Sequence, residues 1–263
     1  MMSREQGELK GSVKGYWEKT PCGAGDVATL EEGSLEFFET VEQQRYGGDA
    51  FMFDVVGFDR WGGKRVLEVG CGLGTDLLQF ARGGADVYGV DLTQKGARLA
   101  RRRLALYGQK GNTLVGDSEN LPFPDGYFDL VYSWGVIHHT PDTEKAAREI
   151  MRVCKPGGRV LVMIYHRRSL LALQSWIVYG LLRGAPQRSA SELIARHVES
   201  PGTKSYTPEE ALKLFDGLKE AHVQRIVTRY DLRLGRRLFL PTWMRAVVPS
   251  QLGWFMIVNG VKA

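Results

Sequence analysis

Residues 66–74 read V-L-E-V-G-C-G-L-G, an apolar strand pattern that runs into Gly70, Gly72 and Gly74 at alternate positions. Because these glycines lack a Cβ, they permit a tight turn from strand to helix and a close approach of a ligand to the backbone. The helix that follows offers free N–H groups and the positive end of its dipole. Glu68, at the end of the strand, would attract a cationic ligand group and repel a phosphate. The stretch therefore favours a ligand with a cationic group over a nucleotide phosphate.

A second acidic residue ends the next predicted strand. Residues 86–91 read D-V-Y-G-V-D, and Asp91 follows Gly70 at the spacing of about 20 residues that places a carboxylate on ribose hydroxyls. Dinucleotide-binding proteins have glycine or alanine where this chain has Thr75. Asp91 thus indicates a nucleoside site without deciding which nucleoside binds there.

The decisive pattern lies further along the chain. A short apolar strand ends in Gly116-Asp117, and Y-F-D-L-V-Y-S-W at residues 127–134 forms another strand. Residues 142–154 are predicted to form a helix that ends at a K-P-G-G turn. A fifth strand begins over residues 159–165.

These motifs, in this order, resemble those of the class I S-adenosylmethionine-dependent methyltransferases. They are most similar to the small-molecule group that includes the ubiquinone and menaquinone biosynthesis enzymes. The resemblance is dense over residues 60–166. It implies a Rossmann-like, doubly wound α/β fold, in which a seven-stranded sheet has its last strand antiparallel and a helical cap is added.

The alternation of strand and helix divides the chain into four segments. A helix start is expected at Thr207, with proline next and two acids in the first turn. Strands over residues 223–230 and 254–261 would complete the sheet. The four segments are an N-terminal helical segment over the cofactor cleft (1–59), the cofactor-binding core (60–166), the helical cap (167–205) and the C-terminal completion of the sheet (206–263).

The resemblance also implies which residues hold S-adenosylmethionine. Glu68 and the glycine loop face the methionine end, and Asp91 takes the ribose hydroxyls. Asp117 accepts a hydrogen bond from the adenine amino group, and Trp134 approaches the sulfonium, since an aromatic ring attracts a cation. The expected set is completed by Gly70, Cys71, Gly72, Gly74, Thr75, Leu92, Ser118 and Ser133, and by Tyr16 and Trp17 of the N-terminal segment.

A general base is expected at the carboxyl edge of the sheet, where ligands bind in open α/β folds. His138 and His139 follow the fourth strand, and histidine titrates near neutral pH. Tyr165 and His166, at the end of the fifth strand, are the other candidates. The alternative for the paired histidines is packing against the next helix.

The composition is that of an ordinary globular enzyme. The chain has 263 residues, of which 43% are hydrophobic and 25% charged, and its net charge is +5. Arg101, Arg102 and Arg103 are interpreted as solvated helix surface. Three consecutive residues cannot share one helix face, so these arginines are not expected to form a single basic patch. This pattern disfavours a nucleic-acid partner. A nucleic-acid partner is left as an alternative by two basic pairs, Arg167-Arg168 and Arg236-Arg237.

Cysteine usage and hydropathy predict a cytoplasmic protein. The three cysteines match no metal-ligand spacing, no signal peptide is evident, and no acidic cluster suggests a catalytic metal. No apolar run is long enough to span a bilayer. The nearest, residues 170–182, is predicted to form an amphipathic helix or a helix pair that covers the substrate pocket. Its alternative role is an interfacial membrane contact that collects a lipid-like acceptor.

The predicted function is in-line transfer of a methyl group from S-adenosylmethionine to a small-molecule acceptor. Oxygen is favoured as the acceptor atom over carbon, nitrogen or sulfur. The Asn/Asp-Pro-Pro-Tyr turn of amino-directed nucleic-acid and protein methyltransferases is missing, and Ser-Trp-Gly-Val stands in its place at residues 133–136. RNA or protein methylation and a non-catalytic S-adenosylmethionine-binding module are the alternatives. The sequence predicts no oligomeric state.

Overall fold

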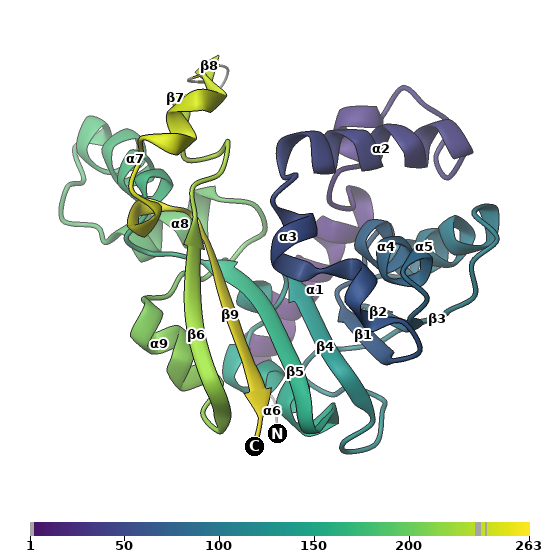
Figure 1. Cartoon of the computed structure of the whole chain (residues 1–263). Helices are drawn as coiled ribbons and strands as arrows, with labels where there is room; N and C mark the ends of the chain where they lie inside the picture. The colour runs from purple at the N-terminus through teal and green to yellow at the C-terminus, as the bar shows by residue number, and fades with distance from the viewer. Residues whose placement is uncertain (1–2, 235–237, 240) are drawn as a thin grey trace.

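A seven-stranded sheet organises the protein in this computed structural model, which describes residues 3–234, 238–239 and 241–263. The strand order is β3-β2-β1-β4-β5-β9-β6, and β9 runs antiparallel to both of its neighbours while the other pairs are parallel (Figure 1). The predicted doubly wound sheet with an antiparallel last strand is therefore confirmed. The strands are β1 (Arg65–Val69), β2 (Asp86–Asp91), β3 (Asn112–Val115), β4 (Phe128–Trp134), β5 (Cys154–Tyr165), β6 (Leu218–Ile226) and β9 (Phe255–Lys262).

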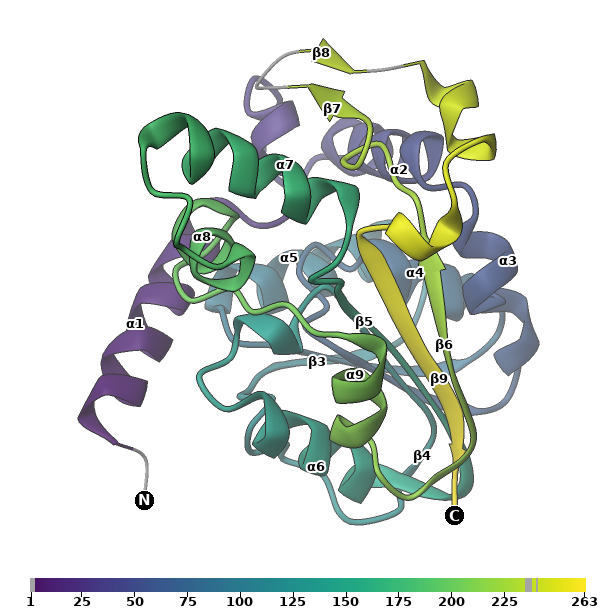
Figure 2. The same ribbon diagram turned by 90° about the vertical axis from the view of Figure 1, so that its left-hand side faces the viewer.

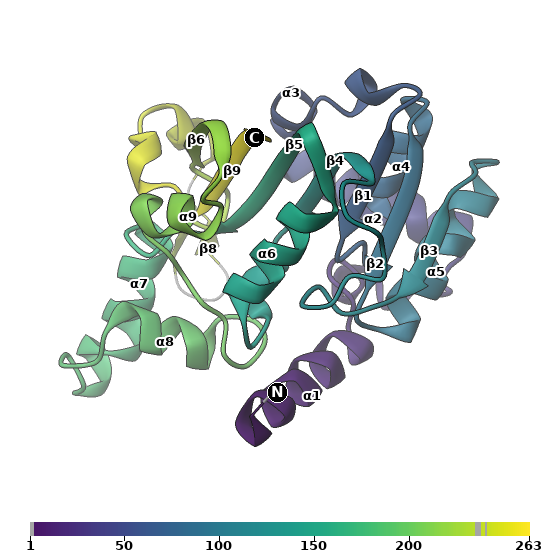
Figure 3. The ribbon, with the colours of Figure 1, turned by 90° about the horizontal axis from the view of Figure 1, so that it is seen from below.

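Helices cover both faces of the sheet because successive apolar side chains of its strands point to opposite faces. In β1, Val66 packs into one apolar cluster and Leu67 into the other. Helices α4 (Thr75–Arg82) and α5 (Gln94–Leu106) cover the first face, and α6 (Thr143–Val153) and α9 (Pro208–Leu214) cover the second (Figure 3). The core thus lies in two layers, one on each side of the strands.

The remaining elements lie around the carboxyl ends of the parallel strands or along the side of the molecule (Figures 1 and 2). The helices are α1 (Arg4–Lys19), α2 (Leu35–Gly48), α3 (Met52–Val56), α7 (Leu170–Tyr179) and α8 (Ala190–His197). A short pair of strands, β7 (Arg233–Leu234) and β8 (Leu238–Phe239), is separate from the main sheet. Turns of 3-10 helix occur at Gly25–Val27, Phe58–Trp61, Ile137–His139, Leu181–Arg183, Thr242–Ala246 and Ser250–Leu252.

Strand β6 ends earlier than the alternation predicts. It stops at Ile226 instead of residue 230, because the chain turns at Thr228. The Asp231 carboxylate closes this turn by accepting hydrogen bonds from the Thr228 N–H (2.8 Å) and from its hydroxyl (3.1 Å). The predicted start of α9 is confirmed, since Thr207 caps the helix and Glu210 bonds back to the Thr207 N–H.

Arg103 corrects the interpretation of the arginine run as solvated surface. Arg101 and Arg102 are exposed, but Arg103 is completely buried. It lies on the face of α5 that packs inward, seven residues after the buried Gly96. Its guanidinium donates hydrogen bonds to the Thr75 hydroxyl (2.7 Å), to the Phe38 carbonyl (2.9 Å) and to Glu42 (2.9 Å). Because consecutive residues on a helix point in different directions, the three arginines do not lie on one solvated surface. Arg236 and Arg237 lie outside the described residues.

The predicted cap contains the helices α7 and α8, which pack against each other. Leu193 and Ile194 of α8 are fully buried, and Ile194 belongs to the main apolar cluster. The cap is therefore continuous with the core. Across the described ranges of the chain, every helix is too short or too polar to cross a bilayer.

Candidate active site

A cavity of about 710 Å³ opens at the carboxyl ends of β1, β2, β4 and β5. Its volume is within the range of small-molecule sites. Residues from the glycine loop, from α1, from the cap and from the C-terminal strands all line it. The described residues thus form one continuous space with a glycine-loop end and an aromatic end.

The glycine loop is shaped as the sequence predicts. Gly70 has φ +80° and a Cβ there would lie 2.2 Å from the Val136 side chain, so no other residue fits without displacing Val136. Gly74 has φ +69° and begins α4. Gly72 has φ +47° and a Cβ there would meet nothing within 4 Å. Since Gly72 also lines the cavity, its bare backbone forms an open cradle for a ligand.

Asp91 joins this loop to the next helix. One oxygen of its carboxylate accepts the Gly72 N–H at 2.9 Å, and the other accepts the Thr93 N–H at 2.9 Å. Asp91 and Leu92 both line the cavity. The oxygen that takes the Thr93 N–H also accepts the Thr93 hydroxyl, so the lone pair left for a ribose hydroxyl is on the oxygen that holds the Gly72 N–H. The loop and Asp91 therefore fit a nucleoside group.

Asp117 lies on the cavity wall with Gly116 and Ser118, and a lysine of α1 reaches it. The Lys10 ammonium lies 2.6 Å from one carboxylate oxygen of Asp117 and 2.6 Å from Glu119. Burial alone would lower the pKa of Lys10, but hydrogen bonds to these carboxylates raise it, so the ammonium stays charged. Helix α1 is therefore tied to the end of the cavity where the adenine ring is predicted to bind. No motif in the sequence indicates this role for Lys10.

Glu68 does not line the cavity. It is buried behind the glycine loop, and one of its carboxylate oxygens has no hydrogen-bond partner. Burial, followed by the charge of Asp76, raises the pKa of Glu68 well above its ordinary range. Arg45 of α2 pairs with Asp76, its Nε lying 2.6 Å from the carboxylate, and Arg45 itself lines the cavity. Arg45 therefore places a positive charge at the glycine-loop end of the cavity, and no motif in the sequence indicated this role.

Four other predicted cofactor residues also lie behind the wall. Ser133 is fully buried and donates its hydroxyl to the Val69 carbonyl at 3.1 Å, joining β4 to β1. Thr75 accepts the hydrogen bond from Arg103. Cys71 is buried against Gly89, where the thiol packs as a small apolar group. Gly74 packs against Ala100 of α5. These residues support the loop from behind, and any direct contact with the cofactor stays a prediction.

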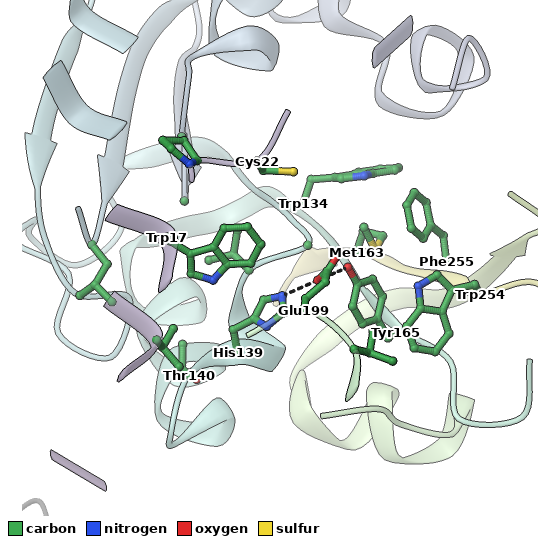
Figure 4. Close-up of a pocket in the computed structure, with 18 of the residues that line it drawn as sticks. Trp17, Cys22, Trp134, His139, Thr140, Met163, Tyr165, Glu199, Trp254 and Phe255 are labelled. Atoms are coloured by element: carbon green, nitrogen blue, oxygen red, sulfur yellow. Dashed lines mark hydrogen bonds and ion pairs between the residues drawn. The ribbon is translucent and has the colours of Figure 1, made fainter. Parts of the chain in front are cut away.

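Aromatic side chains form the other end of the cavity (Figure 4). Trp134 meets Phe255 edge to face at 5.9 Å between ring centroids, and Tyr165 stacks on Trp254 at 4.2 Å. Trp17 of α1 lies at the wall, whereas its neighbour Tyr16 is 41% exposed and packs edge-on against Trp17 at 4.9 Å. This end would therefore accept a flat, mainly apolar molecule.

A polar cluster interrupts the aromatic wall (Figure 4). His139 Nε2 lies 3.2 Å from a carboxylate oxygen of Glu199, and the Tyr165 hydroxyl donates to the same oxygen at 2.7 Å. Burial, and then the charge of Glu199, raises the pKa of Tyr165 well above its ordinary range, so Tyr165 acts as a donor. Glu199 comes from the cap and belongs to no motif, so the sequence offered no local signal for it.

The other two histidines predicted as bases lie off the wall. His138 is completely buried, and both of its ring nitrogens lack a hydrogen-bond partner. Burial lowers the pKa of His138 well below its ordinary value, and the charges of His139 and Lys204 add to this effect. His166 is buried as well, with Nδ1 3.1 Å from the Gly253 carbonyl. Of the four candidates, His139 and Tyr165 line the cavity, whereas His138 and His166 do not.

Comparison with known proteins agrees with this geometry. Residues 67–162 match the family model described as a methyltransferase domain. The chain is 32% identical over 168 residues to a demethylmenaquinone methyltransferase of Thermobifida fusca, covering 61% of this chain and 70% of the relative. It is 37% identical over 120 residues to the chloroplastic tocopherol O-methyltransferase of Arabidopsis thaliana, covering 43% of this chain. The chain spans only 34% of the length of that relative.

The fold is shared with a geranyl diphosphate C-methyltransferase from Streptomyces coelicolor, at a TM-score of 0.65, 17% identity and coverage of 97% of this chain and 98% of the other. The chain belongs to the class I S-adenosylmethionine-dependent methyltransferases. This membership confirms the predicted family and S-adenosylmethionine as the methyl donor.

Proposed function

We propose that this protein transfers the methyl group of S-adenosylmethionine to a hydroxyl oxygen of a small, mainly apolar acceptor. The observation that carries the proposal is a continuous cavity, which joins the cradle at Gly72 and Asp91 to an aromatic wall containing His139. Oxygen is favoured over nitrogen because a hydroxyl is a poor nucleophile until it loses its proton, whereas a neutral amine already has a reactive lone pair, and His139 with Glu199 can accept that proton. Proteins whose sequences are similar to this chain include O-, C- and N-methyltransferases.

The glycine-loop end would hold the cofactor. Asp91 would accept the ribose hydroxyls, Asp117 the adenine amino group, and the Gly72 backbone would lie against the ligand. Arg45 would attract the carboxylate of the methionine end. Trp134 of the aromatic wall would stabilise the sulfonium by cation–π attraction. When bound, S-adenosylmethionine supplies a methyl group already activated by its sulfonium.

The aromatic end would hold the acceptor in line with that methyl group. Orientation of this kind can supply roughly 7–11 kcal/mol of a barrier. Helix α7 contributes Leu171 and Val178 to the lining of the cavity, and α1 contributes Trp17, so elements far apart in the chain would enclose the reacting atoms. Enclosure by apolar side chains excludes water, which strengthens every electrostatic interaction at the site.

The experiment that tests this function is a transfer assay with methyl-labelled S-adenosylmethionine and four acceptor panels: phenols and enols, amines, thiols, and carbon nucleophiles. The proposal expects label in methyl ethers, identified by mass spectrometry. Label in amines, thiols or C-methyl products would refute the choice of oxygen. Label in total RNA or protein would support the first alternative function. Binding of S-adenosylhomocysteine without transfer to any acceptor would support a non-catalytic module.

A further inference from the structure

We propose that His139 and Glu199 act together as the general base, so that the acceptor is a molecule with an acidic hydroxyl, such as a phenol or an enol. This inference rests on the proposed function and names the proton acceptor and the acceptor class. His139 takes the proton at Nε2, and Glu199 stabilises the imidazolium that forms. Glu199 lies outside the family motifs, which fall within residues 60–166.

The hydroxyl groups around His139 favour the tautomer that has its hydrogen on Nδ1. The Thr203 hydroxyl donates its hydrogen to the Ser200 carbonyl at 2.7 Å, so its oxygen is left to accept. That oxygen lies 3.0 Å from His139 Nδ1, and the Ser200 hydroxyl oxygen lies 2.8 Å from the same nitrogen. An Nδ1–H donated to these oxygens places the lone pair of the neutral ring on Nε2. His139 can therefore accept a proton at Nε2.

Nε2 is not committed to another group. Nε2 lies 3.2 Å from a carboxylate oxygen of Glu199, and the two form an ion pair only once Nε2 is protonated. In the neutral ring Nε2 has no hydrogen-bond partner. The ring is 4% exposed and lines the cavity. An unpartnered nitrogen in so dry a place is costly unless a ligand meets it. A hydroxyl of the acceptor would supply the missing partner.

Glu199 is held in place by several contacts. Its carboxylate accepts the Tyr165 hydroxyl, and its backbone has φ +56°, a left-handed conformation that L residues other than glycine seldom adopt. The turn that follows is fixed by the Lys204 N–H, which donates to the His138 carbonyl at 2.9 Å. Strained residues of this kind persist where the surroundings determine them, and they cluster at active sites.

The two tyrosines beside the cluster cannot replace the histidine. Burial, and then the Glu199 charge, raises the pKa of Tyr165 and also that of Tyr16. Both phenols therefore keep their protons and serve as donors. Tyr165 is accordingly a positioning residue that orients Glu199.

Methyl transfer to the acceptor oxygen is coupled to proton transfer to His139. The acceptor O–H bond breaks and its proton moves to His139 Nε2, while the oxygen forms a bond to the methyl carbon. The bond between that carbon and sulfur breaks, and its electron pair stays on the sulfur. The products are a methyl ether, S-adenosylhomocysteine and an imidazolium beside Glu199, which later releases its proton to water. A phenol or enol suits this base because its acidity is closer to that of histidine than the acidity of an aliphatic alcohol is.

The test compares Glu199→Gln and His139→Ala with the wild type on the best phenolic acceptor. His139→Ala should lower kcat by about 10²–10⁴-fold and remove the acid limb of the pH–rate profile. Glu199→Gln should lower kcat at least tenfold and move that limb to lower pH, because a neutral amide does not stabilise the imidazolium. KM for S-adenosylmethionine should change little in both. Glu144→Gln, an exposed carboxylate of α6, is the matched control.

A second readout does not need turnover. 4-Nitrophenol is titrated into each protein with S-adenosylhomocysteine present, and its absorbance reports the phenol and phenolate forms. The wild type should bind it as phenolate at a pH where the free probe is largely protonated, and both variants should lose this effect. Wild-type kcat and an unmoved profile in Glu199→Gln would overturn the role of Glu199. A wild type that methylates only amines or thiols would instead overturn the proposed function, whatever the variants do.

Discussion

The buried guanidinium of Arg103 donates a 2.9 Å hydrogen bond to the carboxylate of Glu42. This pair joins α5 of the sheet core to α2 of the N-terminal segment, residues that are 61 positions apart in the chain. Arg82 of α4 also pairs with Glu42, so one carboxylate connects three helices. The N-terminal segment that contributes Arg45 to the cavity is thereby fixed to the core.

Removing the charge of Glu42 should destabilise the protein. Glu42→Gln leaves the Arg103 guanidinium buried without its counter-charge, and removal of one partner from a buried ion pair costs about 3 kcal/mol or more. Urea unfolding at pH 7 measures the loss. Glu39→Gln, an exposed change on the same helix, should be neutral. Equal stabilities of the two variants would mean that Arg103 finds enough compensation in Thr75 and the Phe38 carbonyl.

The same pair predicts a pH dependence of stability. Burial alone would raise the pKa of Glu42, but hydrogen bonds from Arg82, Gln79 and Arg103 lower it below 4.5. A folded-state pKa below the unfolded value stabilises the protein above about pH 4.5, and this contribution is lost as the pH falls through the lowered pKa. The stability difference between wild type and Glu42→Gln should therefore shrink as the pH is lowered from about 4.5 through the lowered pKa of Glu42. A difference that is constant over this range would contradict the assignment.

Asp91→Ala should weaken cofactor binding. The carboxylate is predicted to accept the ribose hydroxyls and also holds the Gly72 N–H, so its loss should cost about 1.5–3 kcal/mol, or roughly a 10- to 150-fold rise in Kd. Titration calorimetry with S-adenosylhomocysteine measures it. Asp86→Ala, an exposed acid at the other end of β2, serves as the control. Unchanged affinity in Asp91→Ala would remove Asp91 from the site.

Lys10→Met should release α1 from the cavity. The variant keeps the apolar stem and loses the ammonium that pairs with Asp117 and Glu119. Hydrogen exchange of the α1 amides should become about tenfold faster, which corresponds to roughly 1.4 kcal/mol. Lys14→Met, an exposed change on the same helix, should leave exchange unaltered. Protection that persists in Lys10→Met would show that Trp17 and Val13 hold α1 without the ion pair.

An interfacial membrane contact stays a prediction, and the structure now specifies the surface to test. Leu173, Ile177 and Leu181 are 51%, 36% and 48% exposed at helical spacing, beside the exposed Arg183. The wild type should sediment with vesicles that contain phosphatidylglycerol, and a Leu173→Ser/Ile177→Ser variant should not. Leu35→Ser/Leu106→Ser, which removes exposed leucines elsewhere, is the matched control. A wild type that stays in the supernatant would contradict the contact.

The sequence by itself determined the parts of this protein whose causes are local. The glycine loop follows from the positive φ that Gly70 and Gly74 allow, and Asp91 follows from its spacing to that loop. The start of α9 follows from a threonine whose hydroxyl satisfies the first amides of the helix. In each case the physical reason acts within a few residues, so it can be read along the chain.

Only the tertiary structure decided which side chains reach the cavity. His138 and His139 are neighbours on one 3-10 turn, yet one ring lies inside the core and the other lines the cavity, because one step along the turn changes the direction of the side chain. Glu199 meets His139 from 60 positions away in the chain, through a strained turn of the cap. Arg103 is buried because α2 supplies a carboxylate from another part of the chain. Such contacts depend on how distant elements pack, and no local pattern of residues records them.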